Sequence, residues 1–180
     1  MENNMENNME CSIVKATMED VQALADLFLG HIRKHKEYIS HGEIQMGVGI
    51  GRFEDGQLAA EPTPDAERMW KKYITANISD SEGAFVCKAV SDDGSIVGFV
   101  VAEIQEDGAE PFGMLCDLLV KDGSRTHGTG TALLEHALAW FSSKGISDIY
   151  LESGLNNHAA HEYFRRRGFV KVSEIFKLSR

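Results

Sequence analysis

The chain has 180 residues, which is enough for one domain with its own hydrophobic core and too few for two. Apolar residues make up 43% and charged residues 26%, as in ordinary globular proteins, and no run approaches the roughly 18 apolar residues of a membrane span. With 18 basic and 28 acidic residues, the formal net charge is −10, which repels phosphate backbones and argues against nucleic-acid binding. This charge favours solubility, and attraction of a cationic substrate is the alternative.

The N-terminus carries a repeated Met-Glu-Asn-Asn tetrapeptide. Residues 1–11 are therefore predicted to be a disordered tail, and residues 12–180 to be a single domain. The tail has neither the basic start nor the apolar stretch of a signal peptide, and together with the lack of a membrane span this predicts a cytoplasmic protein. The three cysteines are widely spaced and odd in number, so free thiols are expected.

The first half of the chain predicts a strand over 12–16 and then a helix, because apolar residues recur at helical spacing from Val21 to Ile32. The segment from Gly42 to Pro64 holds five glycines and is predicted to be a long loop. It is either a flexible substrate loop or a tolerated insertion, and the sequence does not decide between them. A second helix is expected to begin at Pro64.

The second half predicts two strands over 84–90 and 96–104 joined by a turn, and a nearly continuous apolar strand over 112–120. A helix follows over 128–144, then a strand over 149–151, a helix that begins at Asn156 or Asn157 and ends at Gly168, and a last strand over 169–178. The order predicts a single α/β domain with a mixed central sheet flanked by helices.

A glycine-containing turn lies between the buried strand that ends at Val120 and the helix that begins near Gly128. Glycines let a backbone approach a ligand closely, and the free amides at a helix N-terminus bind anions. This setting predicts a phosphate-binding loop over Arg125–Gly130. The triplet of a P-loop is absent from the chain, and Leu133 stands where a dinucleotide fingerprint needs its third glycine.

The Arg125-x-x-Gly128-x-Gly130 pattern after a strand ending in valine resembles motif A of the GNAT superfamily of N-acetyltransferases. A second motif, Asn157-x-x-Ala160 on a helix followed by Gly168-Phe169, is similar to the same family. The resemblance covers about residues 12–178 in element order and about 112–170 in specific residues. It implies a GNAT-like fold in which two parallel strands splay apart.

The resemblance also implies the position of acetyl-CoA, between the strands that end near Val120 and Leu151. The pantetheine arm would contact the backbone of Leu118, Leu119 and Val120, and Asn157 would touch the cofactor. The pyrophosphate would lie on the loop that follows the strand. The residues expected there are Arg125, Thr126, His127, Gly128, Thr129, Gly130 and Thr131.

The implied reaction is attack of a neutral amine on a thioester, which needs a group to remove the amine proton and benefits from an acid. Where some relatives carry a glutamate base, this chain has Met114 and Cys116. Asp117 is the candidate base, although simple strand alternation puts it on the opposite face from Cys116; Glu103 and Glu152 are weaker alternatives. Phe164 occupies the place of the family's usual tyrosine acid, which leaves the neighbouring Tyr163 as the candidate.

No metal site is expected, because the histidine pairs His158/His161 and His31/His35 each lack an evident third ligand in the sequence. The predicted partners are acetyl-CoA and an amine of a small molecule or protein, with neither nucleic acid nor membrane, and a homodimer is a candidate because relatives are often dimers. Two alternatives remain open: a CoA-binding sensor or catalytically weak relative, and an acyltransferase that uses a bulkier donor or makes esters.

Overall fold

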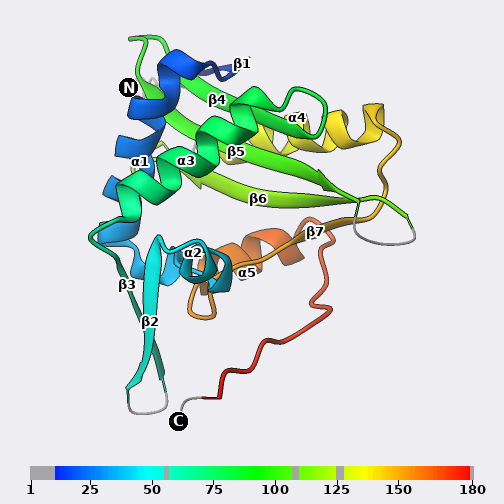
Figure 1. The fold of residues 1–180 in the computed structure, drawn as a ribbon. Coiled ribbons are helices and arrows are strands. Elements are labelled where there is room, and N and C mark those ends of the chain that lie inside the picture. Colours follow the sequence, from blue (N-terminus) through cyan, green and yellow to red (C-terminus); the bar gives the residue numbers. More distant parts are fainter. Residues whose placement is uncertain (1–10, 55–56, 107–109, 125–127, 179–180) are drawn as a thin grey trace, which may run out of the picture.

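The computed structural model describes residues 11–54, 57–106, 110–124 and 128–178, and these residues build a mixed sheet flanked by helices (Figure 1). The main sheet has five strands in the order β1-β4-β5-β6-β7. Neighbouring strands are antiparallel except for the parallel pair β6 and β7. The strands are β1 (Cys11–Lys15), β4 (Ala84–Ser91), β5 (Ile96–Gln105), β6 (Phe112–Val120) and β7 (Ile149–Leu151). The predicted mixed α/β fold is therefore confirmed.

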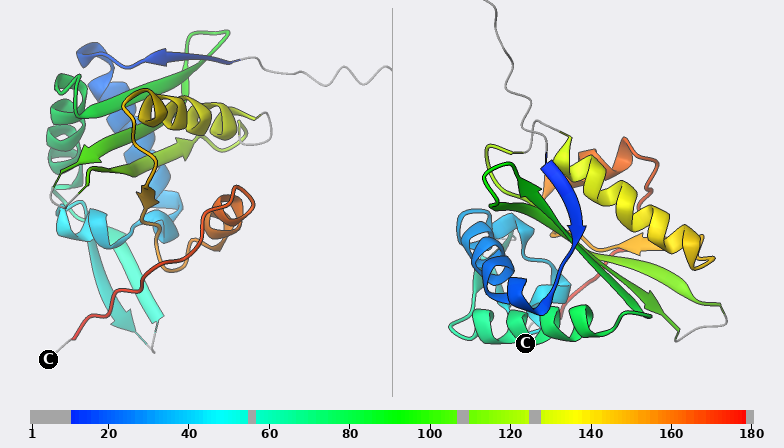
Figure 2. Two further views of the ribbon diagram at one scale, coloured as in Figure 1. Left: turned by 90° about the vertical axis from the view of Figure 1, so that its right-hand side faces the viewer. Right: turned by 90° about the horizontal axis from the view of Figure 1, so that it is seen from above.

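Helices cover both faces of this sheet (Figure 2). On one face lie α1 (Val21–Lys34) and α3 (Ala66–Ser79), and on the other lies α4 (Thr129–Ser143). Short 3-10 turns occur at Met18–Asp20 (η1) and Lys36–Tyr38 (η2), and α5 (His158–Arg165) lies beyond β7. None of the described helices is long and apolar enough to cross a bilayer.

Each face has its own core. On the α1 and α3 side, the fully buried Phe28 stacks on Trp70 with ring centroids 4.6 Å apart, and Phe99 of β5 packs edge-on against the indole. On the α4 side, Leu133 and Phe141 are fully buried against the strands. Each such side chain contributes about 1.5–3 kcal/mol by leaving water. The two cores hold β5 and β6 rigidly between them.

A β-bulge interrupts β6 beside its centre. Val101 of β5 pairs with Asp117, but the next residue, Ala102, pairs with Leu115, so Cys116 is an extra residue without a direct partner. An extra residue locally cancels strand alternation. As a result, Cys116 and Asp117 both turn toward the α1 and α3 side, and the prediction that they face opposite ways is wrong.

The parallel pair β6 and β7 is short. Only three residue pairs form, and the last is Leu115 with Leu151. β6 continues for five more residues to Val120, whereas β7 ends at Leu151. The sheet is therefore open beside the carboxyl-terminal half of β6, as the resemblance implied.

The segment from Gly42 to Pro64 is structured, so its prediction as a long loop is wrong. It contributes to the short helix α2 (His41–Gln45) and forms a hairpin of β2 (Gly49–Glu54) and β3 (Gln57–Pro62). The glycines allow close packing of the hairpin. A Cβ on Gly49 would lie 2.5 Å from Ile39 Cγ2, and one on Gly51 would lie 2.8 Å from Ile44 Cδ1.

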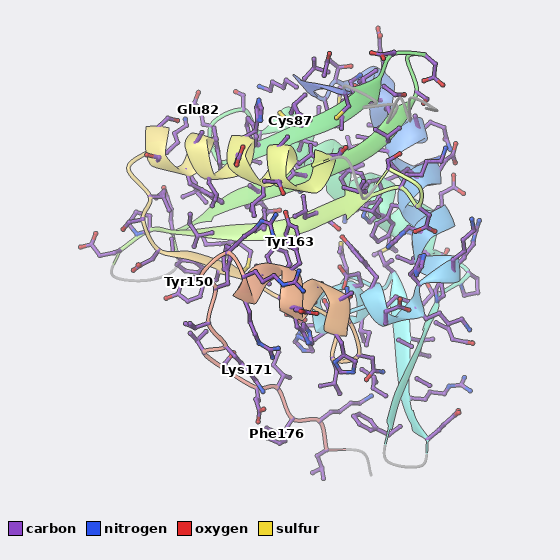
Figure 3. All side chains as sticks on the ribbon, turned by 180° about the vertical axis from the view of Figure 1, so that it is seen from behind. Glu82, Cys87, Tyr150, Tyr163, Lys171 and Phe176 are labelled. Atoms are coloured by element: carbon purple, nitrogen blue, oxygen red, sulfur yellow. The ribbon has the colours of Figure 1, made fainter. Side chains whose placement is uncertain are left out.

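The last strand, predicted over 169–178, is absent, because residues 169–178 have no regular secondary structure. Their apolar side chains are exposed, with Phe176 at 88%, and Figure 3 shows Lys171 and Phe176 standing clear of the helices and the sheet. Strand-like composition needs a neighbouring edge to pair with, and this segment does not use one. At the other end, Cys11 pairs with Ser91 in the sheet rather than belonging to the tail, and the predicted disorder of residues 1–10 lies outside the described residues.

Candidate active site

A cleft lies where β6 and β7 separate, and three parts of the chain line it. One wall is β6 and the turn after β7, the second is α5, and the third is the segment between α1 and the hairpin. The lining residues are Leu115, Cys116, Leu118, Leu151, Glu152, Ser153, Asn157, Ala160, Phe164, Tyr38, Ser40 and Glu43. The cleft therefore brings β6 and the Asn157 helix together with a segment that carried no motif in the sequence.

A buried carboxyl group lies behind the cleft wall. Asp117 is 4% exposed and accepts two hydrogen bonds, one from the Tyr38 hydroxyl at 3.2 Å and one from the Tyr73 hydroxyl at 3.0 Å. Burial raises the pKa of Asp117 to about 7, the nearby Glu43 charge adds to the rise, and the two tyrosines oppose it. A carboxyl with a pKa near 7 can take up or release a proton under ordinary conditions.

Tyr38 connects this carboxyl group to the cleft. It lines the cleft and donates to Asp117, whereas Tyr73 donates from α3 and is not part of the lining. Burial and the neighbouring acidic groups hold the pKa of both tyrosines well above the usual value. Both hydroxyls therefore keep their protons at neutral pH, and Tyr38 is positioned to pass one to Asp117 while accepting another from the cleft.

Two glutamates make the cleft acidic. Glu43 is 7% exposed, and its Oε2 accepts the Ser40 backbone N–H at 2.6 Å as part of a capping box at the start of α2. Burial raises the pKa of Glu43, while its bonds to Ser40 act in the opposite direction. Glu152 follows β7 and accepts the Gly42 backbone N–H at 3.0 Å. Carboxylates held in this way attract a positively charged ligand.

The first turn of α4 lies where the sequence predicts the phosphate-binding loop, and we call this part of the molecule the anion side. Gly128 is its N-cap residue and has φ 77°, a left-handed conformation that favours glycine. Thr129 is 2% exposed, and its hydroxyl lies 3.4 Å from Cys11 Sγ. Free amides and the helix dipole at this end suit a phosphate. The other predicted loop residues, Arg125, Thr126 and His127, lie outside the described residues.

Tyr163 lies at this anion side rather than in the cleft. Figure 3 shows it on the side of α5 that faces α4, and a Cβ on Gly130 would lie 3.7 Å from its hydroxyl oxygen. That oxygen is buried and has no hydrogen-bond partner among the described residues. The guanidinium of Arg167 lies 3.6 Å from the ring centroid of Tyr163 and donates to the Thr131 hydroxyl. A cation and an unpaired hydroxyl thus face the first turn of α4.

The other predicted residues are divided between the cleft and the core. Leu118 and Asn157 line the cleft, and Asn157 Oδ1 caps α5 by accepting the Ala160 N–H at 3.3 Å. Leu119 is 1% exposed and packs its side chain into the core on the α1 and α3 side, away from the cleft lining. Val120 packs on the α4 side.

Burial raises the pKa of Cys116, which argues against a nucleophilic thiolate.

Sequence reasoning missed Tyr38, Glu43 and Ser153. Ser40-x-x-Glu43 is a capping-box pattern, so the start of α2 was readable in the sequence, but the distance of α2 from β6 was not. Ser153 lines the cleft, and its buried hydroxyl has no hydrogen-bond partner among the described residues. An unpaired buried hydroxyl is costly unless a ligand satisfies it.

The chain matches the acetyltransferase (GNAT) family over residues 52–169. It is 31% identical over 124 residues to the aminoglycoside N(6')-acetyltransferase type 1 of Stenotrophomonas maltophilia, over 66% of this chain and 80% of the relative. The fold resembles the aminoglycoside 6'-N-acetyltransferase AAC(6')-Ih of Acinetobacter baumannii with a TM-score of 0.65 at 14% identity, over 95% of this chain and 98% of that one. The fold also resembles AAC(6')-Iy in complex with a CoA-based bisubstrate analogue, with a TM-score of 0.62 at 14% identity. The match covers 95% of this chain and 98% of that one.

An open mixed sheet with an anion-binding helix end beside its parallel strands is the architecture of an acyl-CoA-dependent acyltransferase. The chain belongs to the acetyltransferase (GNAT) family, and it is an acyltransferase. The resemblance inferred from the two motifs is confirmed.

Proposed function

We propose that this protein transfers the acetyl group of acetyl-CoA to a primary amine of a cationic small molecule, such as an aminoglycoside or another polyamine. The observation that carries this proposal is the acidic cleft beside β6, which Glu43, Glu152 and Tyr38 line, with Asp117 bonded to Tyr38 behind the cleft wall. A polyamine needs several negative groups to hold it, whereas a neutral amine would gain little from them. The similarity to a named aminoglycoside acetyltransferase supports the same class of acceptor.

The residues around the cleft also fit the donor. Acetyl-CoA supplies an activated acyl carbon and a thiolate leaving group. The first turn of α4 would hold its pyrophosphate, with Arg167 and the unpaired Tyr163 hydroxyl adding a charge and a donor there. The unpaired Ser153 hydroxyl would donate to an oxygen of the donor within the cleft.

In the proposed mechanism, Glu152 and Glu43 bind the ammonium form of the acceptor and hold the reacting nitrogen beside Tyr38. The Tyr38 oxygen takes a proton from that nitrogen while the Tyr38 proton moves to Asp117. The nitrogen then forms its bond to the acyl carbon, and the carbon–sulfur bond breaks with its electron pair leaving on sulfur. The thiolate takes up the second proton that the nitrogen loses as the amide forms, so CoA departs as the thiol. Asp117 acts through Tyr38 and is therefore a positioning residue.

This assignment gives Tyr163 a different role from the one the sequence suggested. The prediction that Tyr163 is the general acid remains open, but its hydroxyl lies near Gly130, at the pyrophosphate end. A thiolate with a thiol pKa of about 8.5 is a good enough leaving group to depart without a dedicated acid. The proposed mechanism therefore uses Tyr163 for cofactor binding.

The proposal is tested by release of free CoA from acetyl-CoA in the presence of separate panels of aminoglycosides, linear polyamines, amino acids and peptides. We expect turnover with the polycationic panels and little with neutral amines. Tight CoA binding in a thermal-shift assay without turnover on any amine would favour the CoA-sensor alternative. Preference for a longer acyl-CoA would favour the bulkier-donor alternative, and failure to bind CoA would refute the proposal altogether.

A further inference from the structure

Two histidines of α1 and one aspartate after β6 form a compact group outside the cleft. His31 and His35 are four residues apart on the last turn of α1 and its C-cap, and their rings stack with centroids 4.5 Å apart. Asp122 lies in the turn that follows β6, 87 residues from His35 in the sequence. Among the described residues, one potential ligand atom from each of these three side chains lies within 4.8 Å of the others.

His35 and Asp122 already have nearly the spacing that two ligands of one metal ion require, and the His31 ligand atom lies within 4.8 Å of both. The distances between His35 Nε2 and the two Asp122 carboxylate oxygens are 3.1 and 2.9 Å. Zinc bonds of about 2.0–2.1 Å at tetrahedral angles place neighbouring ligand atoms roughly 3.3 Å apart. A shift of a few tenths of an ångström would therefore open the His35–Asp122 contact to the bonding distance of an ion.

The surroundings of the two imidazoles fix their orientation. His35 Nδ1 lies 3.1 Å from Glu37 Oε1, so this carboxylate can hold the proton on Nδ1 and leave the Nε2 lone pair for a metal. Such a carboxylate–histidine arrangement supports many metal sites. His31 is 8% exposed and packs edge-on against Tyr38 with ring centroids 5.2 Å apart, which prevents it from rotating freely.

We propose that His31, His35 and Asp122 form a binding site for a divalent transition-metal ion, with zinc, cobalt or nickel as the matching class. Two imidazoles and one carboxylate suit these ions better than calcium or magnesium, which prefer oxygen ligands alone. Three protein ligands leave one position open for water or another ligand. The Asp122 side chain is 48% exposed, so the group reaches the solvent on the Asp122 side.

The proposed ion would join the end of α1 to the turn between β6 and α4. Asp122 stands six residues before Gly128, the N-cap of α4. The same end of α1 leads into η2, which carries Tyr38. Metal binding would thus stabilise the contact between the two segments that deliver Tyr38 and the anion-binding turn to the active site.

The test uses the full-length chain without a histidine tag, treated with chelator and titrated with Co²⁺ at neutral pH. The visible absorption of bound Co²⁺ reports coordination, and isothermal titration calorimetry reports stoichiometry. Two variants, His35→Gln and Asp122→Asn, replace partly exposed ligands. A third, His31→Gln, replaces the buried ligand. Glu37→Gln tests the second carboxylate. The matched control is His158→Ala with His161→Ala, which removes a helical histidine pair whose rings lie 5.8 Å apart and which has no third ligand among the described residues.

We expect one Co²⁺ per chain, a visible band, and a higher melting temperature with metal. His35→Gln and Asp122→Asn should each weaken binding by at least about tenfold, Glu37→Gln should weaken it by about tenfold with the band retained, and the control should match the wild type. If His31→Gln does not fold, His35→Gln and Asp122→Asn still test whether these side chains bind the metal ion. The proposal would be overturned by any of three results: no saturable Co²⁺ binding, unchanged binding in both His35→Gln and Asp122→Asn, or loss of binding in the control alone. The three residues would then form an ion-pair contact and no metal site.

Discussion

Tyr38 donates a 3.2 Å hydrogen bond to Asp117, across 79 residues of sequence. The carboxyl group is otherwise enclosed by the core, with its second oxygen bonded to Tyr73. Because Tyr38 lines the cleft and Tyr73 does not, the proposed mechanism uses this bond to carry a proton from the cleft to the buried acid.

Asp117 should make stability depend on pH. Because its pKa is raised to about 7 in the folded protein from about 4 in the unfolded chain, the folded state binds more protons between these values. The free energy of unfolding should therefore fall as pH rises from about 4 to about 7, by an amount on the order of 4 kcal/mol from this group. Asp117→Asn should remove that part of the slope. Urea unfolding at several pH values measures it, and equal slopes in the two proteins would contradict the burial argument.

Tyr38→Phe and Tyr73→Phe form a matched pair, because each removes one donor to Asp117 from a partly buried tyrosine. Each should lower stability by about 1–3 kcal/mol, since Asp117 loses a partner. Only Tyr38→Phe should also lower kcat/KM, by roughly 10²–10⁴-fold, since it removes the hydroxyl that faces the cleft. Steady-state assays and thermal unfolding separate the two effects. Equal activity losses in the pair would rule out the proton route through Tyr38.

Gly130→Ala should weaken CoA binding without disturbing the fold. A Cβ there would lie 3.5 Å from Val120 Cγ2 and 3.7 Å from the Tyr163 hydroxyl, which is ordinary contact, but it would cover the amides of the first turn of α4. Gly128→Ala should in addition destabilise by about 1–2 kcal/mol, because its φ is 77°. Gly94→Ala is the control, since φ is 82° in a hairpin turn between β4 and β5. It should cost stability and leave CoA affinity unchanged, as measured by calorimetry.

Glu152→Gln should raise KM for a polycationic acceptor by about tenfold, which corresponds to ~1.4 kcal/mol. KM for acetyl-CoA should stay the same, because Glu152 lies on the acceptor side of the cleft. Glu82→Gln is the control: Glu82 is also an exposed glutamate but pairs with Lys144, away from the cleft lining. Kinetics at two salt concentrations provide the measurement. An identical response of the two variants would show that overall charge, rather than the cleft, attracts the acceptor.

The sequence by itself determined the parts of this protein that depend on local pattern. Periodicity and turn residues placed β6 and α4 nearly to the residue, and the glycines after Val120 together with the Asn157 helix indicated the family. The same local reasoning was wrong for Gly42–Pro64, where glycine content suggested a loop. Those glycines instead permit close packing against Ile39 and Ile44, and that role depends on residues outside the segment.

Tertiary structure alone decided which side chains meet. The β6 bulge turned Asp117 toward Tyr38 and Tyr73, and strand alternation could not anticipate one extra residue. In the same way, Asp122 joins His31 and His35 only because the turn after β6 passes the end of α1. Such contacts arise from the packing of segments distant in sequence, whereas helix and strand patterns record only the nearest neighbours along the chain.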